Sequence, residues 1–305
     1  MRKSSLFVCL LVAFGTAQAA DLVIHEWGTV TTIHDAAGKP ATGLNRIDET
    51  EVLPEFVHRY EPATTRQPNR RLAKSSRVPG RPDVTLRLET PVIYFHPPPN
   101  QKYDTPIDVT VRFRGGVLNE FYPDAEASVA LDTPRVQDKM EAGVIKEWNG
   151  DVLNNYVVGT LQWKGLRLHD TVVAPLTRSE IWLAPRAVSS VSVFSPAAGE
   201  GEQYLFYRGV AHLEALLQTK VTDSQVTLSA PTQLAWLEAS ATVPNIWLAD
   251  EAEAMLNTWK ASYFQKAGLR VFYIVPREWT DYFLPLEFSV PTRVSRVIVG
   301  RIDLG

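Results

Sequence analysis

Short runs of β-branched and aromatic residues dominate the chain from Leu22 onward. The runs have the length of strands and are separated by Pro, Gly, Asn and Asp, a pattern typical of strands joined by turns. The predicted strands are 22–33, 84–95, 107–113, 128–132, 156–163, 180–183, 188–194, 203–208, 225–229, 269–275 and 294–302. Because no helical pattern alternates with most of these runs, we expect a mainly β, antiparallel sandwich-like fold.

One segment near the end of the chain departs from this pattern. Apolar residues recur there at helical spacing, namely Ala252, Met255, Leu256, Trp259 and Tyr263. Asp250 and Glu253 are suited to cap the N-terminus of such a helix, and Gly268 is suited to end it. We therefore expect one amphipathic C-terminal helix over about 250–267.

The first residues of the chain have the features of an export signal. Arg2 and Lys3 precede an apolar run over 6–14, and Ala17-Gln18-Ala19 supplies the small side chains that signal peptidase requires. We expect a signal peptide over 1–19 and a periplasmic or secreted protein of a bacterium.

The composition is that of an ordinary globular protein. The chain has 305 residues, 45% of them hydrophobic, with 34 acidic against 31 basic residues. We expect a single mainly β unit over 20–305, with any subdivision near 196–202. The acidic excess argues against a nucleic-acid partner, and no run after the signal has the length of a transmembrane helix. The basic stretch 66–87 is interpreted as a solvated loop or, alternatively, as a contact for an anionic polymer.

Cysteine usage excludes several kinds of chemistry. The only cysteine, Cys9, lies within the predicted signal. The mature chain is therefore expected to be free of cysteine, which excludes disulfides, thiolate metal sites and a cysteine nucleophile. The sequence also lacks glycine-rich nucleotide-binding motifs and the Gly-x-Ser-x-Gly motif of serine hydrolases.

The segment His25-Glu26-Trp27-Gly28-Thr29 begins like the helix of a zinc protease. That motif needs a second histidine at the fifth position, where this chain has Thr29. The β-branched residues that follow favour a strand, on which His25 and Glu26 would point to opposite faces. We therefore reject a metalloprotease helix at this position.

Three histidines are nevertheless candidate metal ligands. His25, His58 and His96 stand beside aromatic or apolar residues in three separate segments. Three converging imidazoles would bind zinc or copper and leave one coordination position open. The alternative is that each histidine is a hydrogen-bonded structural residue.

Charged residues beside aromatic residues are candidate catalytic groups. His25, Glu26, Glu120 and Arg208 are suited to acid–base work on a glycosidic or ester bond. The same residue types also form structural ion pairs at the end of a sandwich, and the sequence leaves both interpretations open.

Aromatic residues are candidate ligand-binding groups. Trp27, Tyr122 and Trp148 are the candidates for rings that stack on a sugar, and Trp148 lies in the most turn-like context. Burial of these rings in the core is the alternative.

Several segments together resemble one set of proteins. They are His25-Glu26-Trp27-Gly28-Thr29, Glu89-Thr90-Pro91-Val92-Ile93-Tyr94-Phe95, Tyr204-Leu205-Phe206-Tyr207-Arg208-Gly209, the predicted helix that contains Trp259, and Thr280-Asp281-Tyr282-Phe283-Leu284-Pro285-Leu286. The chain resembles exported bacterial proteins that share an N-terminal His-Glu-Trp-Gly-Thr motif. The resemblance implies export and one integrated unit, and it assigns no catalytic residue.

Two functions are carried forward from the sequence. The first is a binding or structural module of the cell envelope, with a polysaccharide or other envelope component as partner. The alternative is a hydrolase of a polysaccharide or other envelope polymer, with or without a histidine-bound metal, in which Glu26 or Glu120 works with His25 or His58.

Overall fold

The computed structural model describes residues 22–44, 52–61, 84–99, 102–141, 156–213, 215–222, 225–229 and 248–304. The predicted signal peptide, Trp148 and most of the basic stretch lie outside these ranges. The predicted mainly β, sandwich-like fold is confirmed.

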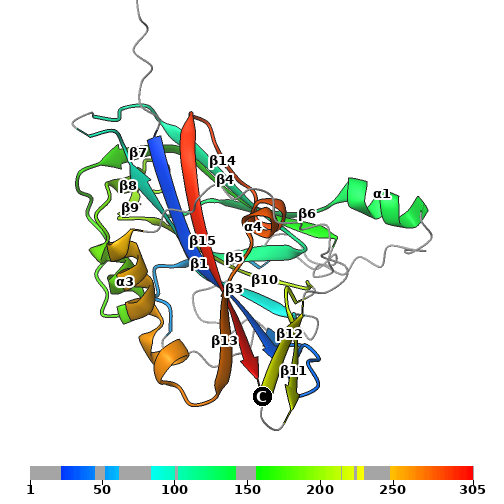
Figure 1. Cartoon of the computed structure of the whole chain (residues 1–305). Coiled ribbons are helices and arrows are strands. Elements are labelled where there is room, and N and C mark those ends of the chain that lie inside the picture. Colours follow the sequence, from blue (N-terminus) through cyan, green and yellow to red (C-terminus); the bar gives the residue numbers. More distant parts are fainter. Residues whose placement is uncertain are drawn as a thin grey trace, which may run out of the picture.

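The largest element is a seven-stranded sheet in the order β13-β15-β1-β3-β10-β5-β2 (Figure 1). Its strands are β1 (Leu22–His34), β2 (His58–Arg59), β3 (Leu86–His96), β5 (Gly116–Tyr122), β10 (Leu205–Ala211), β13 (Leu269–Ile274) and β15 (Thr292–Leu304). Neighbouring strands run antiparallel, except that β1 and β15 run parallel.

A second sheet packs against one face of the first. Its strands are β14 (Leu286–Phe288), β4 (Ile107–Arg114), β7 (Val157–His169), β8 (Ser192–Ser195) and β9 (Glu200–Glu202), and β6 (Glu126–Leu131) pairs with β7. The core between the sheets contains Ile24, Phe95, Phe113 and Trp163, and Trp279 of α4 (Arg277–Phe283) joins it. A separate hairpin consists of β11 (Gln218–Thr222) and β12 (Gln225–Ser229).

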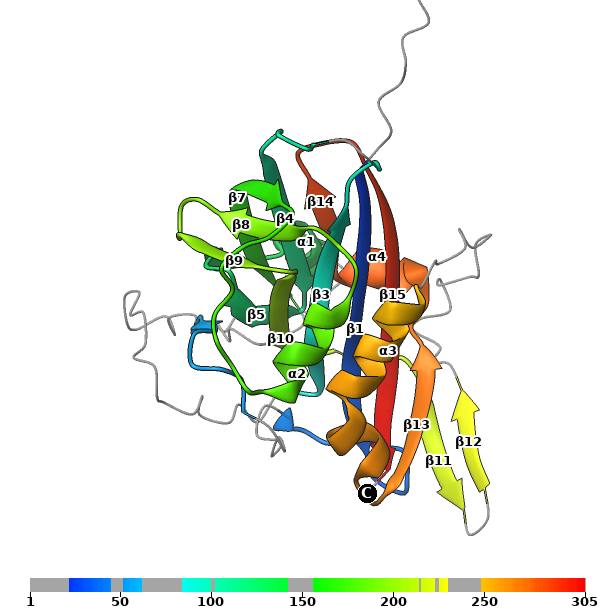
Figure 2. The ribbon, with the colours of Figure 1, turned by 90° about the vertical axis from the view of Figure 1, so that its left-hand side faces the viewer.

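Helices cover the opposite face of the large sheet (Figure 2). They are α2 (Glu180–Leu183), the 3-10 helix η2 (Ala184–Ala187), α3 (Ala249–Thr258) and the π-helix η4 (Lys260–Gln265). Trp27, Trp182, Phe206, Met255 and Trp259 belong to the core on this side. The large sheet therefore has two buried faces, one against a sheet and one against helices.

Two helix predictions need correction. The expected single helix over 250–267 is divided, because α3 ends before Trp259 and η4 continues the segment with π-helical geometry. The segment 180–183, predicted as a strand, is helix α2. Its four residues are too few to show a helical or strand period.

Three further features were not predicted. Helices α1 (Thr133–Glu141) and α4 lie in segments without a strong apolar period, and the parallel pairing of β1 with β15 joins residues some 270 positions apart. Strands that precede residues 196–202, where a subdivision was considered, pair in the large sheet with strands that follow these residues. In the described part of the chain, no helix has the length and apolar character needed to cross a membrane.

A β-bulge in β3 alters which side chains share a face. Trp27 pairs with Val92 and Thr29 pairs with Glu89, so β3 holds one extra residue between these pairs. Thr90 lies in the bulge with a φ of 47°, a conformation that is strained for a β-branched residue. The bulge places Glu89 on the same helix-covered face as Val92, although their odd spacing would separate them in a regular strand.

Candidate metal centre

Three potential metal ligands converge where β1, β3 and α3 meet. They are His25 in β1, His96 at the end of β3 and Glu251 in the first turn of α3. One ligand atom from each residue lies within 4.8 Å of the others. The residues are far apart in the sequence, so only the fold brings them together.

Strand pairing explains how the two histidines meet. His25 is paired with Tyr94, and His96 is paired with Val23. Because side chains alternate along a strand, His96 shares a face with Tyr94 and is the diagonal neighbour of His25. The two imidazole centroids are accordingly 4.7 Å apart.

Helix α3 supplies the carboxylate. The Nδ1 atom of His25 is 2.7 Å from Oε1 of Glu251, and Nε2 of His96 is 3.5 Å from the same oxygen. The backbone N–H of Leu248 donates to Oε2 of Glu251 at 3.4 Å. The start of the helix is fixed to the preceding helical layer, because Asp250 accepts a hydrogen bond from the backbone N–H of Ser189 at 2.8 Å.

The carboxylate is kept in its charged form. Burial alone would raise the pKa of Glu251, but the imidazoles of His25 and His96 outweigh burial and hold that pKa below its ordinary value. A negative charge in the first turn of a helix is also stabilised by the helix dipole. The centre therefore presents a carboxylate oxygen to two imidazole nitrogens.

Two of the three residues are buried, and the third is partly exposed. His25 and Glu251 are 5% and 1% exposed, whereas the side chain of His96 is 20% exposed. The Nε2 atom of His96 is buried and makes no hydrogen bond to any described residue. Buried nitrogens of this kind usually have a hydrogen-bond partner, whereas this atom has only the ion-pair contact of 3.5 Å with Glu251.

Two of the three separations between ligand atoms can be compared with those around a zinc ion. Ligand distances of about 2.0–2.1 Å and tetrahedral angles place neighbouring zinc ligands about 3.3–3.4 Å apart. The His96–Glu251 separation of 3.5 Å fits this value, and the His25–Glu251 separation of 2.7 Å is that of a hydrogen bond. An ion would need the imidazole of His25 and the carboxylate to separate by about 0.7 Å.

Glu26, a candidate catalytic residue, lies on the opposite face of β1 from His25. Its carboxylate forms a buried ion pair with Arg296 of β15 and accepts a hydrogen bond from the hydroxyl of Tyr207. Arg296 also pairs with Asp281 of α4 at 3.2 Å. Glu26 therefore contacts the core between the two sheets and does not reach the metal centre.

Glu120 and Arg208 form a second group, away from His25. They pair across β5 and β10 at 3.8 Å, and Arg59 contacts the same carboxylate at 3.3 Å. Arg208 also acts electrostatically on Glu89 of β3, whose carboxylate accepts a 2.8 Å hydrogen bond from Thr31.

This group is an ion network under the π-helix. The hydroxyl of Tyr263 donates to Glu89, and Arg87 lies 3.3 Å from the same carboxylate. Burial would raise the pKa of Glu89, but Arg87 and these hydrogen bonds hold that pKa below its ordinary value. The four candidate catalytic residues thus lie in three places, because only Glu120 and Arg208 come together.

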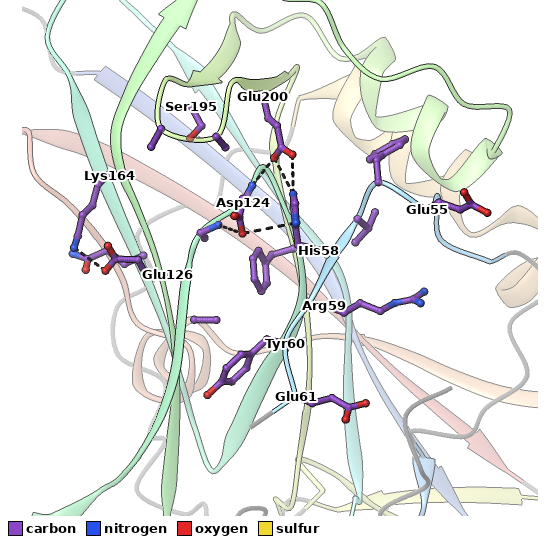
Figure 3. Close-up of a pocket in the computed structure, with 18 residues that line it drawn as sticks. Glu55, His58, Arg59, Tyr60, Glu61, Asp124, Glu126, Lys164, Ser195 and Glu200 are labelled. Carbon is purple, nitrogen blue, oxygen red and sulfur yellow. Dashed lines mark hydrogen bonds and ion pairs between the residues drawn. The ribbon is translucent and has the colours of Figure 1, made fainter. Parts of the chain in front are cut away.

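His58, the third candidate metal ligand, lies apart from His25 and His96. Its Nε2 atom is 2.9 and 3.0 Å from the two carboxylate oxygens of Glu200. Together with Asp124, it lines a pocket beside β2, β6, β7 and the turn from β8 to β9 (Figure 3). The histidine set predicted from the sequence is therefore divided, and Glu251 takes the place of His58.

Two candidate ligand-binding rings are buried. Trp27 and Tyr122 are 1% and 3% exposed, so neither ring offers a face to solvent. Tyr122 stacks beneath His58 with ring centroids 6.0 Å apart. Trp148 lies outside the described residues.

Sequence reasoning did not single out Glu251. The expected cap was Asp250 with Glu253, but the N-cap is Leu248, two residues earlier, and Glu251 takes the position expected for Glu253. An acidic residue in a first helical turn is common, and the sequence contains no signal that links it to a strand more than 200 residues away.

Comparison with protein-family models, curated proteins and solved structures finds no match to this chain.

Proposed function

We propose that this chain is an exported metalloprotein in which His25, His96 and Glu251 hold one divalent metal ion. The observation that carries the proposal is the convergence of these three ligand atoms within 4.8 Å. The Nε2 atom of His96 is buried, lies 3.5 Å from the Glu251 carboxylate and makes no hydrogen bond to a described residue, which agrees with a ligand role.

Zinc is the metal that the ligand types favour. Two imidazoles and a carboxylate form a known catalytic zinc set, whereas Cu(I) prefers sulfur ligands and Ca²⁺ prefers oxygen ligands alone. Fe(II) also binds two histidines and one carboxylate, so elemental analysis is needed to identify the ion.

Metal-assisted hydrolysis is the reaction class that we propose. Three protein ligands leave a position open for water, and a zinc ion lowers the pKa of bound water enough to make it a nucleophile at neutral pH. With the predicted export signal, this favours a hydrolase of an envelope polymer over a purely structural module.

A second candidate function needs no metal. The 2.7 Å contact between His25 and Glu251 resembles the carboxylate–imidazole pair that orients a general base. In that case His25 would be the base, and the protein would be active in the presence of chelator.

Elemental analysis of protein purified without chelator tests the metal centre. We expect one zinc ion per chain in the wild type and in His58→Ala, and loss of the ion in His96→Ala and Glu251→Gln. Removal of a direct ligand should weaken affinity by more than the roughly 10–100-fold typical of outer-sphere partners.

The His58→Ala variant is the matched control, because it removes an imidazole that the sequence suggested as a ligand and that lies elsewhere. Circular dichroism would establish that each variant is folded. A folded wild type without metal, even after zinc is added, would refute the centre, and equal metal loss in His58→Ala would refute the ligand set.

A further inference from the structure

A second built site lies in the pocket that contains His58. Its volume is about 780 Å³, within the range of small-molecule binding sites. The walls come from four segments: 55–61, 121–127, β7 and the turn between β8 and β9. The pocket is therefore assembled by the fold and shares no residue with the metal centre.

One wall carries polar groups that hold one another in place. Both oxygens of Glu200 contact Nε2 of His58, and one of them also accepts the backbone N–H of Asp124 at 2.8 Å. The carboxylate of Asp124 lies 3.8 Å from Nδ1 of His58. Because these contacts fix the side chains in advance, a ligand would not need to order them.

The facing wall carries one charge of each sign. Lys164 of β7 and Glu126 of β6 form a 2.7 Å ion pair, and Figure 3 shows them across the pocket from His58 and Glu200. The pocket thus presents both strong donors and strong acceptors. Its lining holds five carboxylates against two permanent cations: Glu55, Glu61, Asp124, Glu126 and Glu200 against Arg59 and Lys164.

Apolar surface lies between these walls. The partly buried Tyr60 contributes a ring. Small side chains that leave room for a ligand come from Ala125, Ala127, Ala197 and Ala198. The pocket therefore combines flat apolar surface with fixed hydrogen-bonding groups of both signs.

We infer that this pocket binds a pyranose segment of a glycan. Sugar hydroxyls both donate and accept, so they can bond to the carboxylates of Glu200 and Glu126 and to the ammonium group of Lys164. The C–H face of a pyranose ring can pack on Tyr60, whose side chain is only partly buried. A strongly anionic ligand would meet the carboxylates, and a wholly apolar ligand would desolvate charged groups without replacing their partners.

Calorimetric titration with four defined probes tests this assignment: cellotetraose, chitotetraose, mannotetraose and maltotetraose. The informative variants are Glu200→Gln and Lys164→Met, on opposite walls. The matched control is Lys102→Met, because Lys102 also forms an exposed ion pair, with Asp104, but does not line the pocket.

We expect at least one tetrasaccharide to bind the wild type and the control equally, and both pocket variants to bind about tenfold or more weakly. Lys164→Met should retain the thermal midpoint of the control, which separates lost binding from lost folding. His25→Ala should retain sugar binding, so the result is distinguishable from failure of the metal centre.

Three results would overturn the assignment. They are no heat of binding with any of the four probes at millimolar concentration, equal binding by both pocket variants and the wild type, and binding of spermidine in the absence of any sugar binding. The last result would identify a pocket for cations.

Discussion

Substitution of Glu26 by Gln should destabilise the fold strongly without affecting the metal centre. The side chains of Glu26 and Arg296 are 0% and 2% exposed, and they are paired inside the core between the sheets. Glu26→Gln keeps the shape of the side chain but removes the charge. Arg296 would then remain buried with Asp281 as its charged partner.

The size of the effect follows from this geometry. Removing one partner of a buried ion pair costs about 3–5 kcal/mol, because the other charge stays buried. Asp281, whose side chain is 49% exposed, lies 3.2 Å from Arg296 and offsets part of the loss. We therefore expect a loss of about 3 kcal/mol in the free energy of unfolding.

Urea denaturation followed by tryptophan fluorescence measures this loss. The control is Asp104→Asn, which removes a pair with side chains 84% and 72% exposed and should change stability by less than about 1 kcal/mol. The double variant Glu26→Gln, Arg296→Met should recover part of the loss, since it removes both charges. A Glu26→Gln variant with wild-type stability and no bound metal would refute the structural role of Glu26.

Two further predictions concern the β1–β3 region. Gly28→Ala should lower the free energy of unfolding by about 1–3 kcal/mol, because the added Cβ would lie 2.8 Å from Cα of Pro91. Thermal unfolding measures this loss, and an unchanged midpoint would contradict the close approach of the two strands. Glu89 has a folded pKa below its ordinary 4.5, so its stabilising contribution is present above about pH 4.5 and is lost as pH falls toward the folded value. The stability difference between wild type and Glu89→Gln should therefore shrink on acidification from about pH 6 to pH 3, and a constant difference in urea midpoints would argue against it.

Local patterns in the sequence predict the strands well, because each strand is a short β-branched run bounded by turn residues. The run from Leu22 to His34 is an example, and its strand geometry also explains why His25 and Glu26 face different layers. The pairing of β1 with β15 and the division between α3 and η4 depend on long-range packing, which no local pattern contains.

The sequence predicted only part of the candidate site, because the rest also depends on long-range packing. His25 and His96 could be listed as candidates from residue type, but their proximity depends on the β1–β3 register. The packing of α3 brings Glu251 to His25. His58 lies away from the other two histidines because β2 pairs with β5 at the far edge of the sheet. Residue type therefore identified candidates, and topology selected among them.

The most direct test of the metal centre is an anomalous difference map, recorded at the zinc absorption edge from crystals grown without chelator. The proposal predicts one strong peak about 2.0–2.2 Å from the ligand atoms of His25, His96 and Glu251. Crystals prepared with zinc that show no peak there, or a peak beside His58 and Glu200 instead, would contradict it.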